Sequence, residues 1–451
     1  MGHKTTVDSI IHAQAILTVD ESNCLLHNHS VIIDGGKILN ILPHADAKQN
    51  YCSENSYDLQ QHVLMPGLIN AHGHAAMSLM RGLADDYPLM DWLNDHIWPA
   101  ENAFVSDTFV HDGTELAMAE MIRSGTTCYS DMYFFPEAAA QITAKVGMRA
   151  QFTSPVFDFP SNWGDGPDDY LNKAQDLAKL YHDNELINIA LGPHAPYTVS
   201  DGPMQDAQAL ADKNNLAMQI HLHETAFEVE SAEAESGQRP IARLAALGLF
   251  NANLQCVHMT TLNAQDIKTV AEHGASIIHC PESNLKLASG MTPIQQCIDA
   301  GINIALGTDG AASNNGLNLF SEMRTAALLA KAVAGDATAV DADTAIRMAT
   351  INGAKALGID AITGSLEVGK AADIIAIDFS QLEMQPVHNI NSQIAYTHPA
   401  DKVNYSWVAG KCLMQNRKLL GIDELDVIKR AQQWHKKLQQ KAEEQAQEQN
   451  S

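Results

Sequence analysis

The chain has 451 residues, 45% of them hydrophobic and 18% charged, a composition typical of a globular protein with room for one large α/β barrel and an accessory domain. Its 54 acidic and 28 basic residues give a net charge of −26, which disfavours nucleic acid and anionic membranes as partners. No apolar run approaches the roughly 18 residues of a membrane span, and the first ten residues lack the apolar core of a secretory signal, so we expect a cytoplasmic protein with no membrane partner.

Both ends of the chain predict short β-strands. The first 63 residues contain apolar runs such as SIIHAQAILTVD, and SVIIDGGKILNIL carries a hairpin signal at Asp34-Gly35-Gly36. Similar runs, GSLEVGKAADIIAID and KVNYSWVAGKCLM, lie within residues 364–420. We therefore expect one small β-sandwich domain built from residues 1–63 and 364–420, with the rest of the chain inserted between them.

Residues 64–363 alternate between short apolar runs and segments with helical periodicity. Eight β–α units over roughly 300 residues are typical of a (β/α)8 TIM barrel, so the expected fold class is α/β. A doubly wound open sheet is the alternative, but it needs a G-x-G-x-x-G loop after its first strand, which this sequence lacks. The eight predicted strands are 64–72, 126–132, 149–156, 187–192, 216–222, 254–259, 275–280 and 302–307.

The segment 421–451 predicts a C-terminal helix and tail. From Glu424 onward the sequence is rich in Gln, Glu, Lys and Ala, which is typical of a solvent-exposed helix that frays. Packing of this helix on a neighbouring subunit is the alternative, and we expect a homo-oligomer.

Two histidines end the first predicted barrel strand, in PGLINAHGHA. Residues i and i+2 of a strand point the same way, so His72 and His74 share a face. A single buried histidine is usually a hydrogen-bonded core residue, but two on one face are costly unless something binds them. The seven cysteines form no C-x-x-C motif, so the histidines are the better candidates for a metal site.

Further polar side chains end other predicted strands. The fifth strand gives His221 and His223 on one face, followed by Glu224; the sixth gives His258 and the eighth Asp309. In a barrel the carboxyl ends of all strands meet at one mouth, where active sites are built. Three histidines and a carboxylate suit zinc, or less selectively iron or another divalent ion, with a position left for water.

The same segments carry a family resemblance. PGLINAHGH, HLHET, HCPESNLKLASGMTPI, LGTDGAASNNGLNLFSEMR and GSLEVGKAADIIAID resemble the amidohydrolase superfamily. The nearest branch is that of the methylthioadenosine/S-adenosylhomocysteine deaminases, and the similarity covers residues ~8 to ~420. It implies hydrolytic deamination of a 6-aminopurine nucleoside, such as methylthioadenosine, S-adenosylhomocysteine or adenosine, to an inosine-type product and ammonia.

The resemblance also assigns roles to single residues. It makes one zinc ion per subunit the cofactor, with ligands His72, His74, His221 and Asp309. Glu224 matches the proton shuttle, His258 matches a histidine that faces the attacking water, and Glu101 and His194 match contacts to the ribose and base. Asp309 and Glu224 also contact the substrate, Asp309 taking a proton from water and Glu224 giving one to the ring.

Several features remain open at this stage. Two-metal relatives bridge their ions with a lysine or a glutamate on a middle strand, and INIALGPHAP contains neither, which favours one ion. Ser154 stands where related sequences carry an arginine, which leaves the contacts on the ribose or sulfur side undetermined. Trp92 and Trp98 are candidates for either a lid or core packing. His279 is a candidate for either a pocket or a structural role.

A short stretch after Asp309, SNNGLNLF, predicts the start of a helix. Ser313 or Asn314 is suited to cap that helix, and capping is the role that we expect of them.

Alternative functions remain on the same scaffold. A triazine or N-ethylammeline chlorohydrolase would expel chloride, which needs no proton to leave, so Glu224 favours a deaminase. A guanine deaminase is a further alternative, whereas an imidazolonepropionase-like amide hydrolase fits HLHET less well. The cytidine and tRNA-adenosine deaminase fold requires P-C-x-x-C, which is absent. A non-catalytic scaffold would be expected to lose metal ligands, and all four are present.

Overall fold

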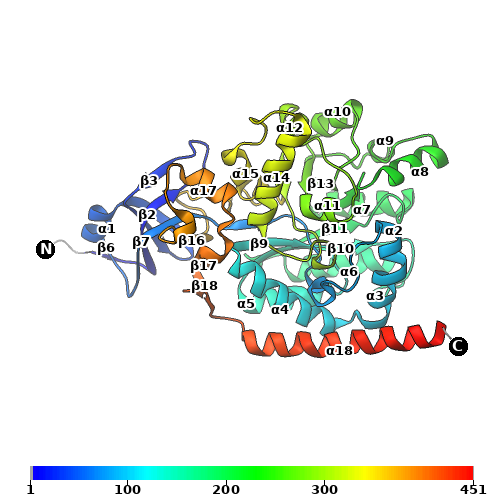
Figure 1. Cartoon of the computed structure of the whole chain (residues 1–451), viewed down its shortest axis with the longest axis horizontal. Helices are drawn as coiled ribbons and strands as arrows, with labels where there is room; N and C mark the ends of the chain where they lie inside the picture. Colours follow the sequence, from blue (N-terminus) through cyan, green and yellow to red (C-terminus); the bar gives the residue numbers. More distant parts are fainter. Residues whose placement is uncertain (1–3, 450–451) are drawn as a thin grey trace.

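The computed structural model describes residues 4–449, so the outermost ends of the predicted segments 1–63 and 421–451 lie outside the described residues. Eight parallel strands form one sheet in chain order, with helices packed around it (Figure 1). The strands are β8 (Leu68–Asn70), β9 (Thr126–Asp131), β10 (Arg149–Val156), β11 (Ile187–Pro193), β12 (Ala217–Leu222), β13 (Leu254–His258), β14 (Ser276–His279) and β15 (Ile304–Leu306).

The first and last of these strands meet, which closes the barrel. The amide of Ala71 donates to the carbonyl of Leu306, and the amide of Asp309 donates to the carbonyl of His72. The seam is tight, because a Cβ on Gly307 would lie 2.9 Å from the carbonyl oxygen of His72. The predicted (β/α)8 barrel is confirmed, and its closure brings the segment that carries Asp309 beside the segment that carries His72.

The helices cover the outside of the barrel and alternate with its strands. Their buried residues recur at helical spacing. In the helix at residues 136–146, for example, Ala138, Ile142 and Val146 lie on one buried face. They are α4 (Asp107–Arg123), α5 (Pro136–Val146), α6 (Pro167–Leu180), α7 (Asp201–Asn214), α8 (Ala226–Ser236), α9 (Pro240–Ala246), α10 (Ala264–His273), α12 (Ile294–Asp299), α14 (Leu319–Ala334), α15 (Ala342–Met348) and α16 (Ile351–Ala356).

The chain makes a long excursion between β8 and α4. It consists of short helical pieces that lie near the carboxyl ends of the strands: η1 (Ala75–Met80), α2 (Leu89–Asp91), η2 (Trp92–Ile97) and α3 (Trp98–Phe104). Two further short helices follow β14 and β15 at the same end, α11 (Pro281–Lys286) and α13 (Ala311–Asn314). Of the helices among residues 4–449, none combines the length and apolarity needed to cross a membrane.

Strands from both chain ends form a second sheet, at the left of Figure 1. The strand β7 pairs in parallel with β2 from the N-terminal part and antiparallel with β16 from the C-terminal part. The predicted hairpin is present, with Gly35 and Gly36 both at positive φ between β4 and β5. The strands are β2 (Ser9–Leu17), β3 (Leu25–His27), β4 (His29–Asp34), β5 (Lys37–Pro43), β7 (Asn55–Pro66), β16 (Ile374–Asp378), β17 (Val403–Val408), β18 (Lys411–Gln415) and β19 (Lys418–Leu419).

The sequence predicted that the apolar run 64–72 forms one barrel strand, but the structure divides this run between two sheets. Its first residues, Leu64 to Pro66, end β7 and pair with β16, and the barrel begins at Leu68. Gly67 separates the two sheets and leaves no room for a side chain, because an added Cβ would lie 2.0 Å from the hydroxyl oxygen of Thr127. An apolar run therefore continues across the boundary because both sheets bury it.

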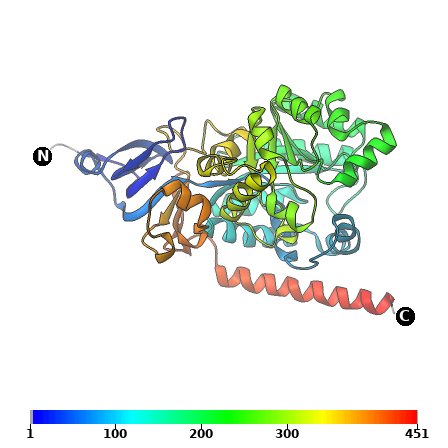
Figure 2. The ribbon, with the colours of Figure 1, turned by 45° about the horizontal axis from the view of Figure 1, so that its top comes forward.

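The C-terminal helix α18 (Glu424–Gln449) runs along the outside of the barrel (Figure 2). The expectation of a simply solvated helix is wrong for its first half. Val427 and Trp434 are buried, and the indole of Trp434 donates to Asp112 on α4. Arg430 pairs with Asp112 and with Glu115 on the same barrel helix. This half of α18 is thus part of the barrel's outer layer.

A buried ion pair joins the barrel to the second sheet. The Nε atom of Arg149, at the start of β10, lies 2.8 Å from Oδ2 of Asp373, and both side chains are almost completely buried. Arg149 also donates to the carbonyl of Glu185, and Asp373 accepts from the amide of Ala409. Removal of one partner would leave the other charge buried and uncompensated.

We predict that Arg149→Met lowers the free energy of unfolding by about 3–5 kcal/mol, measured by denaturant titration. Arg123→Met is the matched control, since the ion pair of Arg123 with Glu424 is more than a third exposed. We expect it to cost no more than about 1 kcal/mol. Equal losses in the two variants would contradict a special role for the buried pair.

Candidate active site

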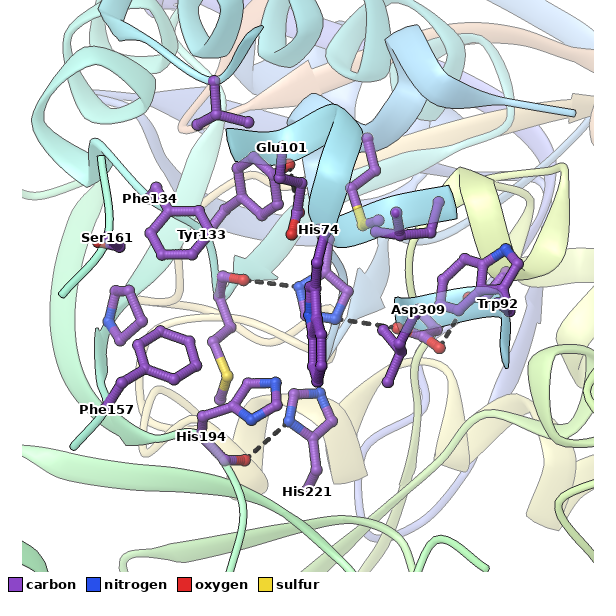
Figure 3. A pocket seen from close by; sticks show the side chains of 18 of the residues that line it. His74, Trp92, Glu101, Tyr133, Phe134, Phe157, Ser161, His194, His221 and Asp309 are labelled. Carbon is purple, nitrogen blue, oxygen red and sulfur yellow. Dashed lines mark hydrogen bonds and ion pairs between the residues drawn. The ribbon is translucent and has the colours of Figure 1, made fainter. Parts of the chain in front are cut away.

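A cavity of about 360 Å³ opens at the carboxyl ends of the barrel strands. Its floor is polar, with His74, His221, His258, Glu224 and Asp309, whereas its walls are mostly aromatic and aliphatic (Figure 3). A mostly apolar cleft with a few converging polar groups is the usual form of a small-molecule site. The side chains on this floor come from four different strand ends.

The floor brings the four predicted ligand residues together. The Nε2 atoms of His72 and His74 lie 3.4 and 3.1 Å from Oδ1 of Asp309. The Nε2 atom of His221 lies 3.3 Å from that of His72. Two overlapping sets of candidate metal donors result, one with His72, His221 and His258 and the other with His72, His74 and Asp309.

Each histidine of the floor is oriented through its Nδ1 atom. His74 and His221 contact main-chain carbonyls through Nδ1, whereas His72 and His258 contact side-chain amide oxygens. This contact places a proton on Nδ1 and leaves the Nε2 atom facing inward, as in proteins that ligate metals through histidine. The Nδ1 partners are Gln219 Oε1, Met132 O, His194 O and Asn284 Oδ1, at 2.6 to 2.9 Å.

The electrostatics of the floor also fit a divalent cation. Burial lowers the pKa of His72 and His221, so both imidazoles are neutral at physiological pH. Burial opposes protonation of His74 too, but Asp309 outweighs it and raises the pKa of His74 to about 9. A cation would therefore displace a proton that His74 and Asp309 now share.

Asp309 is held as a carboxylate. Burial favours its neutral form, but hydrogen bonds with His72 and His74 hold its pKa well below the ordinary value. Its second oxygen, Oδ2, accepts hydrogen bonds from the hydroxyls of Ser283 and Ser313, at 2.7 and 2.8 Å. Oδ1 is left facing the histidines.

The expected capping role of Ser313 and Asn314 is wrong. Both residues lie inside the short helix α13, which follows Gly310, and the next helix is capped by Asn318. Ser313 instead bonds to Asp309, and the amide of Asn314 donates to the carbonyl of Thr308. Hydroxyls that follow a strand-end carboxylate by four residues can turn back onto it, and this spacing is the signal that sequence analysis did not use.

Glu224 is the second carboxyl group of the floor. Burial, and then the charge of Asp309, raise its pKa to about 8, so that it carries a proton at neutral pH. One of its oxygens lies 3.7 Å from Nε2 of His258. The floor thus contains one ionised and one protonated carboxyl group.

His223 does not share a face with His221, in contrast to the prediction. The strand ends at Leu222, and His223 has a φ of +51°. Its ring turns away from the floor, contacting the carbonyl of Thr261 through Nδ1 and accepting from the amide of Ile241 through Nε2. His258 and Asp309 also have positive φ, so the backbone is strained where three strands end at the site.

Glu101 and His194 both line the cavity. Burial raises the pKa of Glu101 to about 7, and the hydroxyl of Tyr133 donates to its carboxylate over 2.6 Å. Burial, together with the neighbouring histidines, lowers the pKa of His194 to about 3, so its ring is neutral. Both groups can hydrogen-bond to neutral polar groups of a ligand.

The features left open by the sequence lie as follows. Trp92 and Trp98 both line the cavity, on the excursion between β8 and α4. Ser154 is buried inside β10, and it is not among the described residues that line the cavity. His279 is buried at the end of β14, with its Nδ1 atom unbonded within the described part of the chain.

The chain is similar to proteins of known activity. The family model described as "Amidohydrolase family" matches residues 63–413. A 5-methylthioadenosine/S-adenosylhomocysteine deaminase of Saccharophagus degradans is 52% identical, over 97% of this chain and 98% of the relative.

Solved structures are similar as well. A zinc-bound adenosine deaminase from Xanthomonas campestris is 45% identical, with a TM-score of 0.96 over 97% of this chain and all of that one. An atrazine chlorohydrolase from Arthrobacter aurescens, also with zinc, has a TM-score of 0.88 over 94% of this chain and 99% of the other. At 22% identity, that likeness shows the fold alone.

We predict that His221→Ala reduces bound zinc from about one ion per chain to less than about a tenth, measured by elemental analysis after dialysis. The exposed His182→Ala variant is the control and should keep its metal. Full metal content in His221→Ala would mean that the ion binds elsewhere.

Proposed function

This chain belongs to the amidohydrolase family, and from that premise we propose that it removes the 6-amino group of adenosine-type nucleosides by hydrolysis, giving the inosine-type product and ammonia. The observation that carries the proposal is the pair of buried carboxyl groups on the floor of one apolar cavity. Glu224 is protonated and Asp309 is ionised, which is the pairing that general acid–base catalysis requires.

His72, His74, His221 and Asp309 would hold one zinc ion, since their inward nitrogen and oxygen atoms suit this metal. When bound, zinc lowers the pKa of a water molecule and so supplies a nucleophile at neutral pH. The middle strand β11 contributes no lysine or carboxylate that could bridge a second ion.

Glu224 acts as the acid toward the ring. It gives its proton to the ring nitrogen next to C6, which makes C6 electrophilic enough to accept the oxygen of water. Asp309 acts as the base, since hydrogen bonds keep its carboxylate ionised, and it takes a proton from that water. His258, held by Asn284 through Nδ1, accepts a hydrogen bond from the attacking water through Nε2 and so orients it.

The reaction then ends with loss of the amine. The C6–O bond has formed, and the C6–N bond breaks as Asp309 returns its proton to the departing nitrogen. The hydroxyl proton left on the C6 oxygen passes to Glu224, which gives the inosine-type product and ammonia and restores both carboxyl groups. A dechlorinating enzyme would expel an anion that needs no proton, whereas a departing amine needs the proton that Asp309 has taken from water.

Glu101 and His194 bind the nucleoside beyond the ring. Both are partly buried polar groups that line the cavity. The ribose hydroxyls are the matching partners, because they can both donate and accept hydrogen bonds.

We predict that Glu224→Gln lowers kcat for adenosine by about 100- to 10,000-fold while zinc stays bound, because glutamine has no proton to transfer. Turnover is followed by ultraviolet absorbance and by ammonia release. Glu233→Gln, on the exposed side of the following helix, is the control and should be fully active. Normal deamination by Glu224→Gln would remove Glu224 as the proton donor.

A further inference from the structure

The cavity wall beyond Glu101 and His194 is formed by residues 157–162. The ring of Phe157 lies 4.9 Å from the ring of His194, between centroids. The side-chain amide of Asn162 donates to the main-chain carbonyls of Glu101, Asn102 and Val105. Because this segment lies against both proposed ribose contacts, we place the 5′ substituent of a bound nucleoside next to it. This step rests on the proposed function.

This wall is apolar and aromatic. Phe157 lies 5.7 Å from Phe134 and 5.1 Å from Phe159, and Pro160 extends the same surface. In Figure 3, Phe134, Phe157 and Ser161 lie on one side of His74, with Asp309 and Trp92 on the other. An aromatic wall favours a thioether or alkyl substituent, which it removes from water.

The cavity also lacks a positive charge. Among the described residues that line it there is no lysine or arginine, whereas Glu101, Glu224 and Asp309 are acidic. The carboxylate of an amino-acid substituent would lose its hydration here and find no cationic partner. Ser154 is buried inside β10 and supplies none.

A neighbouring groove does not change this conclusion. It shares Leu89, Tyr197 and Glu224 with the cavity and contains Arg243. The guanidinium of Arg243 is already bonded to the carboxylate of Asp201 and to the carbonyls of Pro196 and Val199. Glu235 lines the same groove, so a carboxylate placed there would meet a like charge.

We propose that the site selects nucleosides with a neutral 5′ substituent, such as a methylthio group or a hydroxyl, and discriminates against the zwitterionic amino-acid substituent of S-adenosylhomocysteine. The selecting element is the aromatic wall of Phe134, Phe157 and Phe159, together with the lack of a cation in the described lining of the cavity.

The test compares S-adenosylhomocysteine with 5′-butylthioadenosine, which has a similarly long but uncharged substituent. We expect kcat/KM to be at least about tenfold higher for the butylthio compound. The carboxylate of S-adenosylhomocysteine would be left without a partner in the cavity, and one unpaired polar group has an effect of about this size. Equal values for the two substrates would overturn the inference. No deamination of any adenosine-type nucleoside, methylthioadenosine included, would instead overturn the proposed function.

A variant with a positive charge on the aromatic wall tests whether this wall selects the 5′ substituent. Phe159 is 46% exposed, so an arginine can replace it without a buried charge. Phe159→Arg should raise kcat/KM for S-adenosylhomocysteine relative to the butylthio compound by about tenfold, whereas Phe159→Met should leave that ratio unchanged. An unchanged ratio in Phe159→Arg would show that this wall does not select the substituent.

A second, independent observation concerns Glu228 on α8. Its two carboxylate oxygens accept the main-chain amides of His223 and Glu224, at 2.9 and 2.8 Å. The hydroxyl of Thr260 donates to the carbonyl of Glu224 at 2.7 Å. The peptide groups on both sides of the proposed proton donor are therefore fixed where the backbone adopts a positive φ, at His223.

From this geometry we infer that Glu228 is a positioning residue for Glu224, an inference that also rests on the proposed function. The carboxylate extends the usual capping arrangement, in which Thr225 caps α8 and accepts the amide of Glu228. Glu228 reaches past the cap to the two preceding residues. Loss of its carboxylate frees the segment that carries the proton donor.

Glu228→Ala should lower kcat by about 10- to 100-fold, with KM and zinc content nearly unchanged, because the acid is misplaced while binding is kept. Thr225→Ala is the matched control, since it removes the helix cap and leaves the carboxylate in place. We expect its kcat to fall less than about threefold. Equal losses of kcat in the two variants, or full kcat in Glu228→Ala, would overturn the positioning role.

Discussion

The structure of the site depends on the burial of several polar side chains at one place. His72, His221 and His258 are almost completely removed from water, and each contacts a carbonyl or amide oxygen through Nδ1. Once Nδ1 is satisfied, each Nε2 atom needs a partner in the centre of the barrel mouth. A single cation bound by His72 and His221 would satisfy two of these Nε2 atoms, and the Nε2 atom of His258 would accept a hydrogen bond from the water beside it.

The same burial separates the two carboxyl groups into opposite states. Glu224 has no direct hydrogen bond to a cationic group, so desolvation raises its pKa to about 8. Asp309 is equally buried, but hydrogen bonds with His72 and His74 reverse the effect of burial. Acid and base therefore arise from the neighbours of each group and not from its residue type.

Much of the fold, and the convergence of His72, His74, His221 and Asp309, could be predicted from the sequence, because strand periodicity is local and every barrel strand ends at the same mouth. Local patterns do not show where a strand stops. The break after Leu222 turns His223 away from His221, and the break at Gly67 divides one apolar run between two sheets. The partners of Asp309 and the wall at 157–162 depend on contacts between distant segments, which no single stretch of sequence contains.

The most direct test of the central claim is a crystal structure of the zinc-loaded protein with anomalous scattering measured at the zinc edge. We expect one strong anomalous peak per chain, within coordination distance of Nε2 of His72, His74 and His221 and of the carboxylate of Asp309. A peak at another place, or full zinc occupancy without these four side chains around it, would contradict it.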